Sequence, residues 1–180
     1  MVPQQVKGTG LIPVVAYIRD HFGDDGWGRV VEFLPPQLRS ELAHKIMEIK
    51  WYPLELVSEI YNASARTFAG GDLSLCRDIG KAAADYGLSR IYKFFLRFGS
   101  PQMFGSRGPE MWKTYYTGSA LKVLANDKGR ILVELQGLLT SDAHFQSIVG
   151  WMERAGELTG GRNIRMNPDV PSRRVEILYD

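Results

Sequence analysis

Histidine and cysteine are common ligands of metals and haem iron and common catalytic groups, and this chain of 180 residues has three histidines and one cysteine. His21, His44 and His144 fall on three different predicted helices, and no two of them are four residues apart. Metal ligation by them would require the fold to bring them together. We therefore interpret all three as surface or helix-capping residues, and we expect no metal site.

Known catalytic patterns are missing from the sequence. It contains no G-x-S-x-G, no H-E-x-x-H, no phosphate-binding loop and no G-x-G-x-x-G. No candidate nucleophile has a recognisable base beside it. We therefore expect a protein that is not an enzyme.

Cys76 is the one cysteine, so the chain forms no internal disulfide and no cysteine-based metal cage. It lies about one turn inside a predicted helix, where the partial positive charge of the helix N-terminus favours a reactive thiolate. A lone buried cysteine also serves as a small hydrophobic residue. Both interpretations stay open. A single cysteine fits a reducing compartment, and we expect a cytoplasmic protein.

Basic residues gather near the C-terminus, at Arg162, Arg165, Arg173 and Arg174. Such a ribbon could contact phosphate or anionic lipid, or it could be the solvated face of a strand pair. The formal net charge is only +2, so we expect no nucleic-acid partner. No apolar run reaches the length that spans a bilayer. The apolar run 11–18 is interpreted as part of the first helix, and not as a signal peptide.

The elements that would position these side chains are helices in the first 115 residues. Apolar residues recur there at intervals of three and four, between proline and glycine boundaries. We expect Gly87 to separate two helices and Pro109 to open a short one. The predicted helices are 10–22, one capped by Asp24, one carrying Leu38, Leu42 and Ile46, 53–69, one capped by Asp72, 91–98 and the one opened by Pro109.

From residue 118 onward the pattern changes to strand alternation around one further helix. We expect two hairpins, separated by a helix that Ser141 or Asp142 caps. The predicted strands are 119–125, 130–138, 162–167 and 173–179. The fold class is therefore α+β, with N-terminal helices followed by a small antiparallel sheet of about four strands packed on helices. We expect one domain over 1–180, with a helical part at 1–70 and a core at 72–180.

Two groups of residues could form a binding pocket. One predicted helix carries Cys76, Ile79, Gly80 and Ala83 along one stripe. Because the cysteine, glycine and alanine are small, a neighbouring helix can approach closely or a space can remain. The aromatic residues Phe94, Phe95, Phe98, Trp112 and Trp151 could line an apolar pocket or fill the core.

The order of elements in the second half resembles a known superfamily. A cysteine-containing helix (75–80) leads to an aromatic helix (91–96), a hairpin, a helix with Gly150-Trp151-Met152-Glu153, and a last strand pair. This order is similar to the ligand-binding superfamily of nitric-oxide signalling and Golgi transport. Its branches are haem-nitric-oxide-binding domains, vinyl-reductase-type domains and TRAPP subunits. The chain most resembles uncharacterised bacterial proteins found chiefly in myxobacteria.

The departures from that superfamily narrow what the resemblance implies. Haem-binding members have a proximal histidine and a Tyr-x-Ser-x-Arg motif, whereas Tyr61 to Arg66 is one residue too long and lies too early in the chain. Residues 166–180 contain no cysteine or histidine that could bind the metal found in vinyl-reductase-type domains. We therefore expect no cofactor. In one TRAPP subunit family a cysteine placed like Cys76 borders a hydrophobic tunnel and is acylated.

The resemblance implies a non-enzymatic ligand-binding or sensory adaptor domain with an apolar pocket for a small lipophilic molecule. Its expected partners are that ligand and either a second copy of the chain or a signalling protein. The expected ligand-binding residues are Cys76, Ile79, Gly80, Phe94, Phe95 and Trp151. One alternative is a protein–protein interaction module with a filled core. A second is an enzyme that acts on a lipophilic or tetrapyrrole-like substrate.

Overall fold

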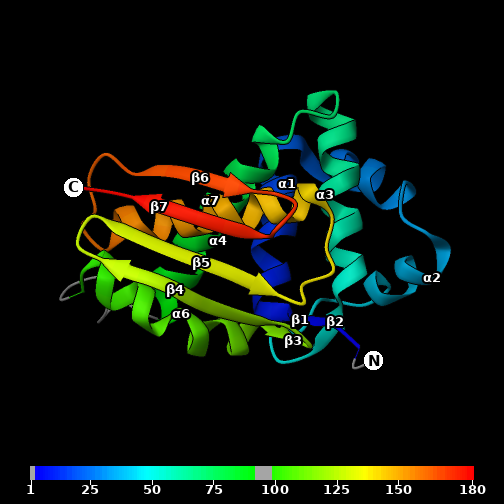
Figure 1. The fold of residues 1–180 in the computed structure, drawn as a ribbon. Coiled ribbons are helices and arrows are strands. Elements are labelled where there is room, and N and C mark those ends of the chain that lie inside the picture. The colour runs from blue at the N-terminus through cyan, green and yellow to red at the C-terminus, as the bar shows by residue number, and fades with distance from the viewer. Residues whose placement is uncertain (1–2, 92–98) are drawn as a thin grey trace.

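The computed structural model of the chain describes residues 3–91 and 99–180. Helices occupy the first half, and a four-stranded sheet lies across the helices of the second half (Figure 1). The α+β class and the order of helices before sheet are therefore confirmed. In chain order the elements are β1 (Gln5–Lys7), α1 (Gly8–Glu32), α2 (Pro36–Arg39), the 3₁₀ helix η1 (Ser40–Leu42), β2 (Trp51–Pro53), α3 (Leu54–Ala69), α4 (Ser74–Ile91), α6 (Pro101–Tyr115), β3 (Tyr116–Thr117), β4 (Ala120–Asp127), β5 (Arg130–Gln136), α7 (Asp142–Leu158), β6 (Arg165–Asp169) and β7 (Arg174–Leu178).

Helix α1 bends sharply at Gly23, whose φ of 73° and ψ of 177° are not helical. The sequence predicts two helices here, with Gly23 as the boundary, and the bend is at that residue. Glycine suits this backbone conformation because it has no Cβ to clash. Pro13 lies within the first part of α1, where it can donate no hydrogen bond to the preceding turn.

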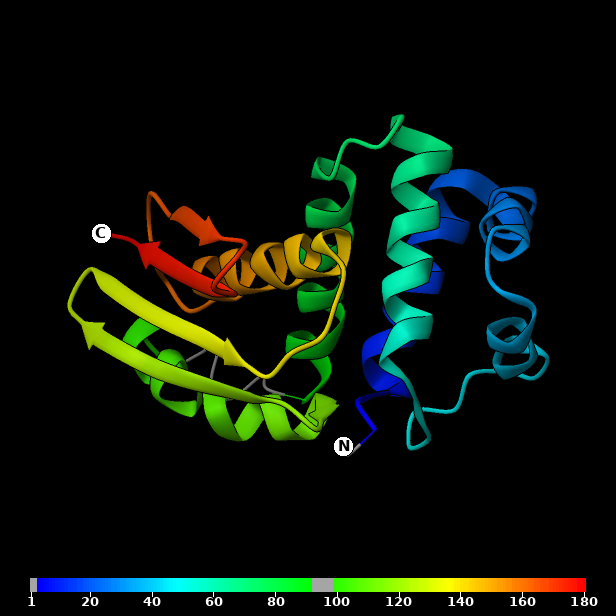
Figure 2. The ribbon, with the colours of Figure 1, turned by 45° about the vertical axis from the view of Figure 1, so that its right-hand side comes forward.

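The helices of the first half stand side by side, and α4 separates them from the sheet (Figure 2). Helix α3 ends at Gly70, which adopts the left-handed conformation as expected for a C-terminal cap. Asp72 then accepts a hydrogen bond from the backbone N–H of Ser74 (2.9 Å), which confirms its capping role. The core between α1, α3 and α4 includes Leu11, Ile18, Leu56, Ile60 and Cys76.

Three predicted helices differ from those observed. The helix predicted from Leu38 to Ile46 is only the short α2 followed by η1. The chain then turns back, so that the backbone N–H of Met47 donates to the Tyr52 hydroxyl (2.9 Å). These tertiary contacts override the apolar spacing that favours a longer helix.

The helix boundaries predicted at Gly87 and Pro109 are also wrong. Helix α4 continues through Gly87, where a Cβ would lie 3.1 Å from the Tyr115 hydroxyl oxygen, so the missing side chain makes room for that phenol. Helix α6 begins at Pro101 and not at Pro109, because the Ser100 side chain caps it. The rest of the aromatic helix predicted at 91–98, after Ile91, lies outside the described residues.

The main sheet is antiparallel, with strand order β4-β5-β7-β6. Its first hairpin turns between Asp127 and Arg130, which are paired, and its second hairpin pairs Asp169 with Arg174. The prediction of four strands in two hairpins is confirmed. The structure also contains a small sheet of order β2-β1-β3, which was not predicted.

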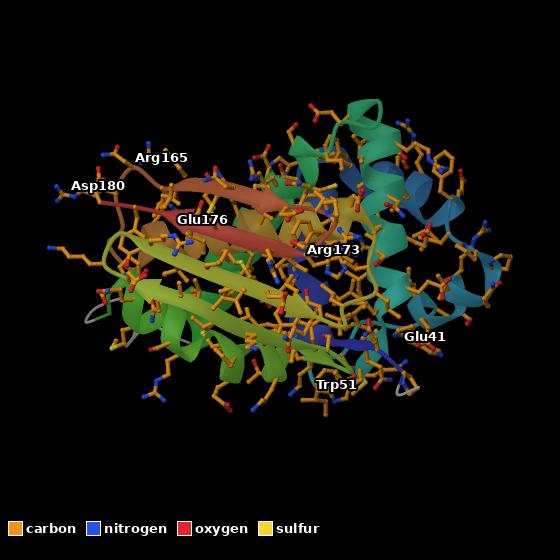
Figure 3. The ribbon with its side chains drawn as sticks, in the orientation of Figure 1. Glu41, Trp51, Arg165, Arg173, Glu176 and Asp180 are labelled. Atoms are coloured by element: carbon orange, nitrogen blue, oxygen red, sulfur yellow. The ribbon has the colours of Figure 1, made fainter. Side chains whose placement is uncertain are left out.

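The two faces of the main sheet differ in chemistry. Val133 and Val175 are buried on the inner face, against Phe145 and Val149 of α7. On the outer face Glu134 lies 2.8 Å from Arg174, and Glu176 lies 2.7 Å from Arg130. Figure 3 shows Arg165 and Glu176 on this outer side. The face carries both signs of charge, which favours the solvated-strand interpretation of the C-terminal arginines over a phosphate-binding ribbon.

Helices α4 and α7 cross in close contact at two glycines, and this pair of helices lies between the helical half and the sheet. A Cβ on Gly80 would lie 1.9 Å from the Ser147 carbonyl oxygen. A Cβ on Gly150 would lie 2.1 Å from the Arg77 carbonyl oxygen. Either methyl group would overlap the facing backbone, so the crossing requires glycine at both positions. Gly80 therefore allows α4 and α7 to approach closely, which is one of the two roles considered for the small helix face.

Candidate functional site: an apolar cavity

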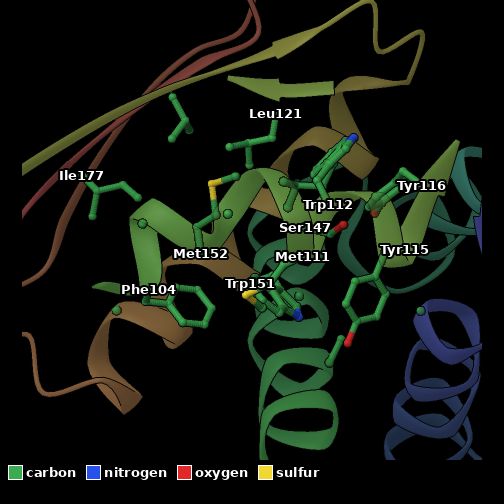
Figure 4. Close-up of a pocket in the computed structure, with 18 of the residues that line it drawn as sticks. Phe104, Met111, Trp112, Tyr115, Tyr116, Leu121, Ser147, Trp151, Met152 and Ile177 are labelled. Carbon is green, nitrogen blue, oxygen red and sulfur yellow. The ribbon is translucent and has the colours of Figure 1, made fainter. Parts of the chain in front are cut away.

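A cavity of about 130 Å³ lies between α1, α4, α6, α7 and the inner face of the main sheet. Figure 4 shows its wall, with Phe104, Met111 and Trp151 at one side and Leu121, Met152 and Ile177 at another. Further wall residues come from α1 and β5, including Pro13, Ile131 and Val133. Among the described residues, nine separate elements contribute to the wall, so a molecule in this cavity would contact both halves of the fold.

The described wall is apolar and aromatic. It contains no Asp, Glu, Lys, Arg, His or Cys among the residues that the structure describes. Met111 and Met152 supply flexible, polarisable side chains that suit an irregular apolar space. A wall of this kind cannot neutralise an ionic group, so the cavity suits an uncharged occupant.

Helix α6 and strand β3 present the largest aromatic side chains to the cavity. The Ser100 cap and Pro101 start α6 in the register that turns Met111 and Trp112 inward, where both are buried. Trp112 stacks on Tyr116 with ring centroids 4.2 Å apart. Its indole N–H donates to the Ser119 hydroxyl (3.1 Å). This bond satisfies the only polar atom of the Trp112 side chain, so the ring presents an apolar face to the cavity.

His144 organises the polar end of the cavity although it does not line it. Its Nε2 lies 3.1 Å from the Tyr116 hydroxyl, and its Nδ1 lies 2.7 Å from the Thr140 hydroxyl. Ser58 of α3 completes the network, 2.8 Å from the Thr140 hydroxyl. Burial lowers the pKa of His144 to about 3, with a smaller effect from the positive charge of Arg173. The imidazole is therefore neutral at physiological pH.

Burial also acts on the phenols at this end. It raises the pKa of Tyr116, with smaller effects from Tyr61 and Tyr115, so the phenol keeps its proton. It raises the pKa of Tyr61 as well, although a hydrogen bond with Ser147 opposes the effect. The polar end thus consists of neutral hydrogen-bonding groups.

The residues predicted to bind a ligand fall into three groups. Gly80 and Trp151 line the cavity. Cys76 and Ile79 are fully buried but are not part of its described wall, because they pack in the core with α1 and α3. Phe94 and Phe95 lie outside the described residues. Trp112, for which pocket and core roles were both open, lines the cavity.

Cys76 is placed differently from the expectation that it borders a cavity. Its thiol points to α3 and donates to the Tyr61 carbonyl at a sulfur–oxygen distance of 3.7 Å. Burial raises the pKa of the thiol to about 12, with a smaller contribution from Asp72. The thiol is therefore protonated at physiological pH, which opposes the reactive interpretation and favours that of a small core residue.

His144 is the main residue that the sequence did not indicate. It was interpreted as a surface or capping residue, but its exposed fraction is 1 %. Ser141 does cap α7 as predicted, by accepting from the His144 backbone N–H (3.2 Å). The sequence signal for burial was available, because His144 stands directly before Phe145 on a helix whose apolar face includes both Phe145 and Ile148.

The fold of this chain is similar to that of several solved structures. The chain superimposes on an unliganded Fe(II) H-NOX protein from K. algicida with a TM-score of 0.74 and 11% identity, covering 97% of this chain and 96% of that one. It matches an H-NOX protein from S. oneidensis in the Fe(II)NO state with a TM-score of 0.71 and 12% identity, covering 97% and 98%. The chain has the H-NOX fold. An oxygen-binding H-NOX domain related to soluble guanylate cyclases gives a TM-score of 0.64, with 16% identity over 97% and 95% of the two chains.

No family model matches the sequence, and no curated protein matches it. The resemblance to the haem-nitric-oxide-binding branch is thus confirmed at the level of fold. The resemblance to TRAPP subunits, vinyl-reductase-type domains and myxobacterial proteins stays a prediction.

The side chains of this protein do not fit haem. Haem iron is held most often by histidine or by a cysteine thiolate, and in some proteins by a tyrosine or by a methionine together with a histidine. Tyr61 and Tyr116 line the cavity, but burial raises the pKa of both phenols, which disfavours the phenolate that would bind iron. All three histidines and the cysteine of the chain are in the described part, and none lines the cavity. His21 and His44 are exposed, and both ring nitrogens of His144 already have partners. The described wall also has no cation for a propionate, and the cavity volume is below the 300–1,000 Å³ typical of ligand pockets.

Within residues 3–91 and 99–180, no group of three or more His, Cys, Asp or Glu side chains is arranged to hold a metal ion. No helix in the same residues is long and apolar enough to cross a membrane.

Proposed function

We propose that this protein is a haem-free binding domain of sensory type, whose cavity holds a small neutral apolar molecule. The observation that carries the proposal is the cavity itself, about 130 Å³ in volume, with a described wall that lacks charged groups, histidine and cysteine. The H-NOX neighbours support it, since one is an oxygen-binding domain and another is in the Fe(II)NO state. In this chain the same fold would bind its ligand without iron.

A sensory role follows from where the cavity lies. Its wall combines Pro13 of α1 and Gly80 of α4 with Ile131 of β5 and Ile177 of β7. A molecule that fits one relative position of these elements better than another shifts the population toward that position. The surface that a partner contacts would then change with occupancy, and no step of this process requires catalysis.

The alternative of a protein–protein interaction module with a filled core makes the opposite prediction about the cavity. A filled core leaves no space for a ligand, whereas the cavity approaches the 150 Å³ of an engineered apolar cavity that binds benzene. The cavity therefore favours ligand binding over the interaction module.

The test is a pair of titrations on the purified full chain. Hemin, followed by visible absorption, is expected to show no saturable one-to-one complex. Benzene is expected to bind, and at about ten times its Kd it should add about 1.4 kcal/mol to the free energy of unfolding. For a chain of this length that raises Tm by about 3–6 °C. A saturable hemin complex would overturn the haem-free part, and the absence of any benzene effect would overturn the cavity.

A matched pair of variants locates the effect. Met152→Trp places a larger ring in the cavity and should abolish the benzene shift. Met47→Trp makes the same exchange at a side chain that is 56 % exposed, and it should leave the shift unchanged. Equal loss in both variants would contradict binding in this cavity.

A further inference from the structure

The polar atoms at one end of the cavity restrict which small molecules can fill it. Tyr116 and Ser147 both line the cavity, and Figure 4 shows their hydroxyl groups on the same side of it. Each hydroxyl has one proton to donate and two lone pairs that can accept. Whether these hydroxyls can donate to a ligand depends on whether they already donate to a group of the protein.

The Ser147 hydroxyl already donates a hydrogen bond to another group of the protein. Its hydroxyl donates to the backbone carbonyl of His144 one turn earlier, at 2.8 Å. Because that proton is committed, the phenol of Tyr61 must be the donor in its hydrogen bond with Ser147. The Ser147 oxygen therefore faces the cavity only as an acceptor.

Tyr116 also directs its proton away from the cavity. Its hydroxyl lies 3.1 Å from Nε2 of His144, and a neutral imidazole has one protonated and one unprotonated nitrogen. The phenol is the more acidic of the two groups, so we assign it as the donor to Nε2. The Nδ1–H of His144 then donates to the Thr140 hydroxyl at 2.7 Å. Lone pairs of the Tyr116 oxygen remain for another donor.

The oxygens of Tyr116 and Ser147 thus line the cavity as acceptors. Buried polar groups are normally hydrogen-bonded, and each acceptor left here favours a ligand that can donate.

Building on the proposed function, we propose that the cavity selects a neutral aromatic molecule of one or two rings that carries one N–H or O–H donor, as indole does. The size follows from the volume of about 130 Å³, close to that of the engineered cavity that holds one benzene ring. The aromatic preference follows from the stacked Trp112 and Tyr116 and from Met111 and Met152, since sulfur–aromatic contacts are favourable. The donor follows from the acceptors at the polar end.

Three bicyclic probes of nearly equal shape test the proposal by isothermal titration of the full chain. Indole has an N–H donor, indene has no polar atom and benzofuran has only an acceptor. One hydrogen bond in a buried site changes affinity by about three- to tenfold. We expect indole to bind about three- to tenfold more tightly than indene, and benzofuran to bind no more tightly than indene.

Variants assign the preference to named atoms. Tyr116→Phe removes the phenol oxygen, so the ratio of the indene Kd to the indole Kd should fall. Ser147→Ala removes the second acceptor and should lower the same ratio, which gives an independent readout if the Tyr116 variant does not fold. Tyr17→Phe removes a phenol on α1 that stacks on His21 at 3.8 Å, away from the described wall, and should leave the ratio unchanged.

The outcomes separate this inference from the proposed function. If benzene binds but none of the three bicyclic probes does, this inference fails and the proposed function stands; if benzene does not bind either, both proposals fail. If indole and indene bind equally, or if benzofuran binds more tightly than indole, the cavity is confirmed but the donor requirement is wrong. If the preference for indole persists in both Tyr116→Phe and Ser147→Ala, these oxygens are not its origin and the inference is overturned.

Discussion

Replacement of Gly80 by alanine is a sharp test of the wall that separates the two halves of the fold. The added methyl group would lie 1.9 Å from the Ser147 carbonyl oxygen, whereas ordinary contacts of this kind begin at 3.4 Å. The two helices would have to separate by about 1.5 Å at this point, the difference between those distances. Backbone, and not a flexible side chain, would have to move on both sides of the crossing.

The cost can be bounded from two opposing effects. Overpacking a well-packed core costs about 1–3 kcal/mol, and displacement of two helices places this site at the upper end. Alanine is the better helix former by about 1 kcal/mol, which offsets part of the cost. We expect Gly80→Ala to lower the free energy of unfolding by about 2 kcal/mol. For a domain of this size the Tm should fall by about 4–8 °C.

Urea unfolding followed by circular dichroism measures the effect, and Gly28→Ala is the matched control. Gly28 also lies inside a helix, but a Cβ there meets no atom within 4 Å. The control should be stabilised by about 0.4–1 kcal/mol, because the substitution reduces the freedom of the unfolded chain. If Gly80→Ala were as stable as Gly28→Ala, the close crossing of α4 and α7 would be refuted.

Three further predictions concern the cavity and its supports. Because the folded pKa of His144 lies near 3 and the unfolded value near 6.5, the unfolded state binds the proton first. Stability should therefore fall as pH drops from about 6.5 toward 3, by up to about 1.4 kcal/mol per pH unit, and this fall should be weaker in His144→Gln when both are measured by urea unfolding. Ser141→Ala should cost about 1 kcal/mol in the same assay, because it removes the N-terminal cap of α7, and an unchanged urea midpoint would contradict that role. Met152→Trp should raise Tm without ligand if the ring fills the cavity well, and a loss of the native circular dichroism spectrum would show that the cavity cannot accept it.

Much of the architecture could be predicted from local patterns. The change from helical spacing to alternation near Gly118, and the turn at Lys128-Gly129, are enough to predict the order of helices and hairpins. Capping residues were also informative, since Ser141 caps α7 and Gly70 ends α3. These features depend on interactions between residues close in the sequence, which is why the sequence reveals them.

Other parts of the fold depend on contacts between distant residues. The sheet of order β2-β1-β3 has strands of two or three residues, too short to show alternation. Gly87 lies within α4, and the residue that its missing side chain leaves room for, Tyr115, is distant in the sequence. Pro101 and Pro109 are eight residues apart, and the sequence pattern alone did not show which of them opens α6.

The candidate site was predicted only in part, for a similar reason. Gly80 and Trp151 were chosen for size and aromatic character, and both reach the cavity. Cys76 shares the helix of Gly80 but faces the carbonyl of Tyr61, because it packs in the core with α1 and α3. The direction in which a helix residue faces depends on its neighbours in space, which no local pattern contains.

The most direct test of the account is methyl NMR of the chain labelled with ¹³C at its methionine methyl groups, titrated with benzene. Met111 and Met152 line the cavity, while Met47 and Met103 are exposed and serve as internal controls. The account predicts saturable shifts of the Met111 and Met152 signals, with Met47 and Met103 unchanged. Shifts confined to Met47 and Met103, or no saturable shift at all, would contradict a ligand-accessible cavity.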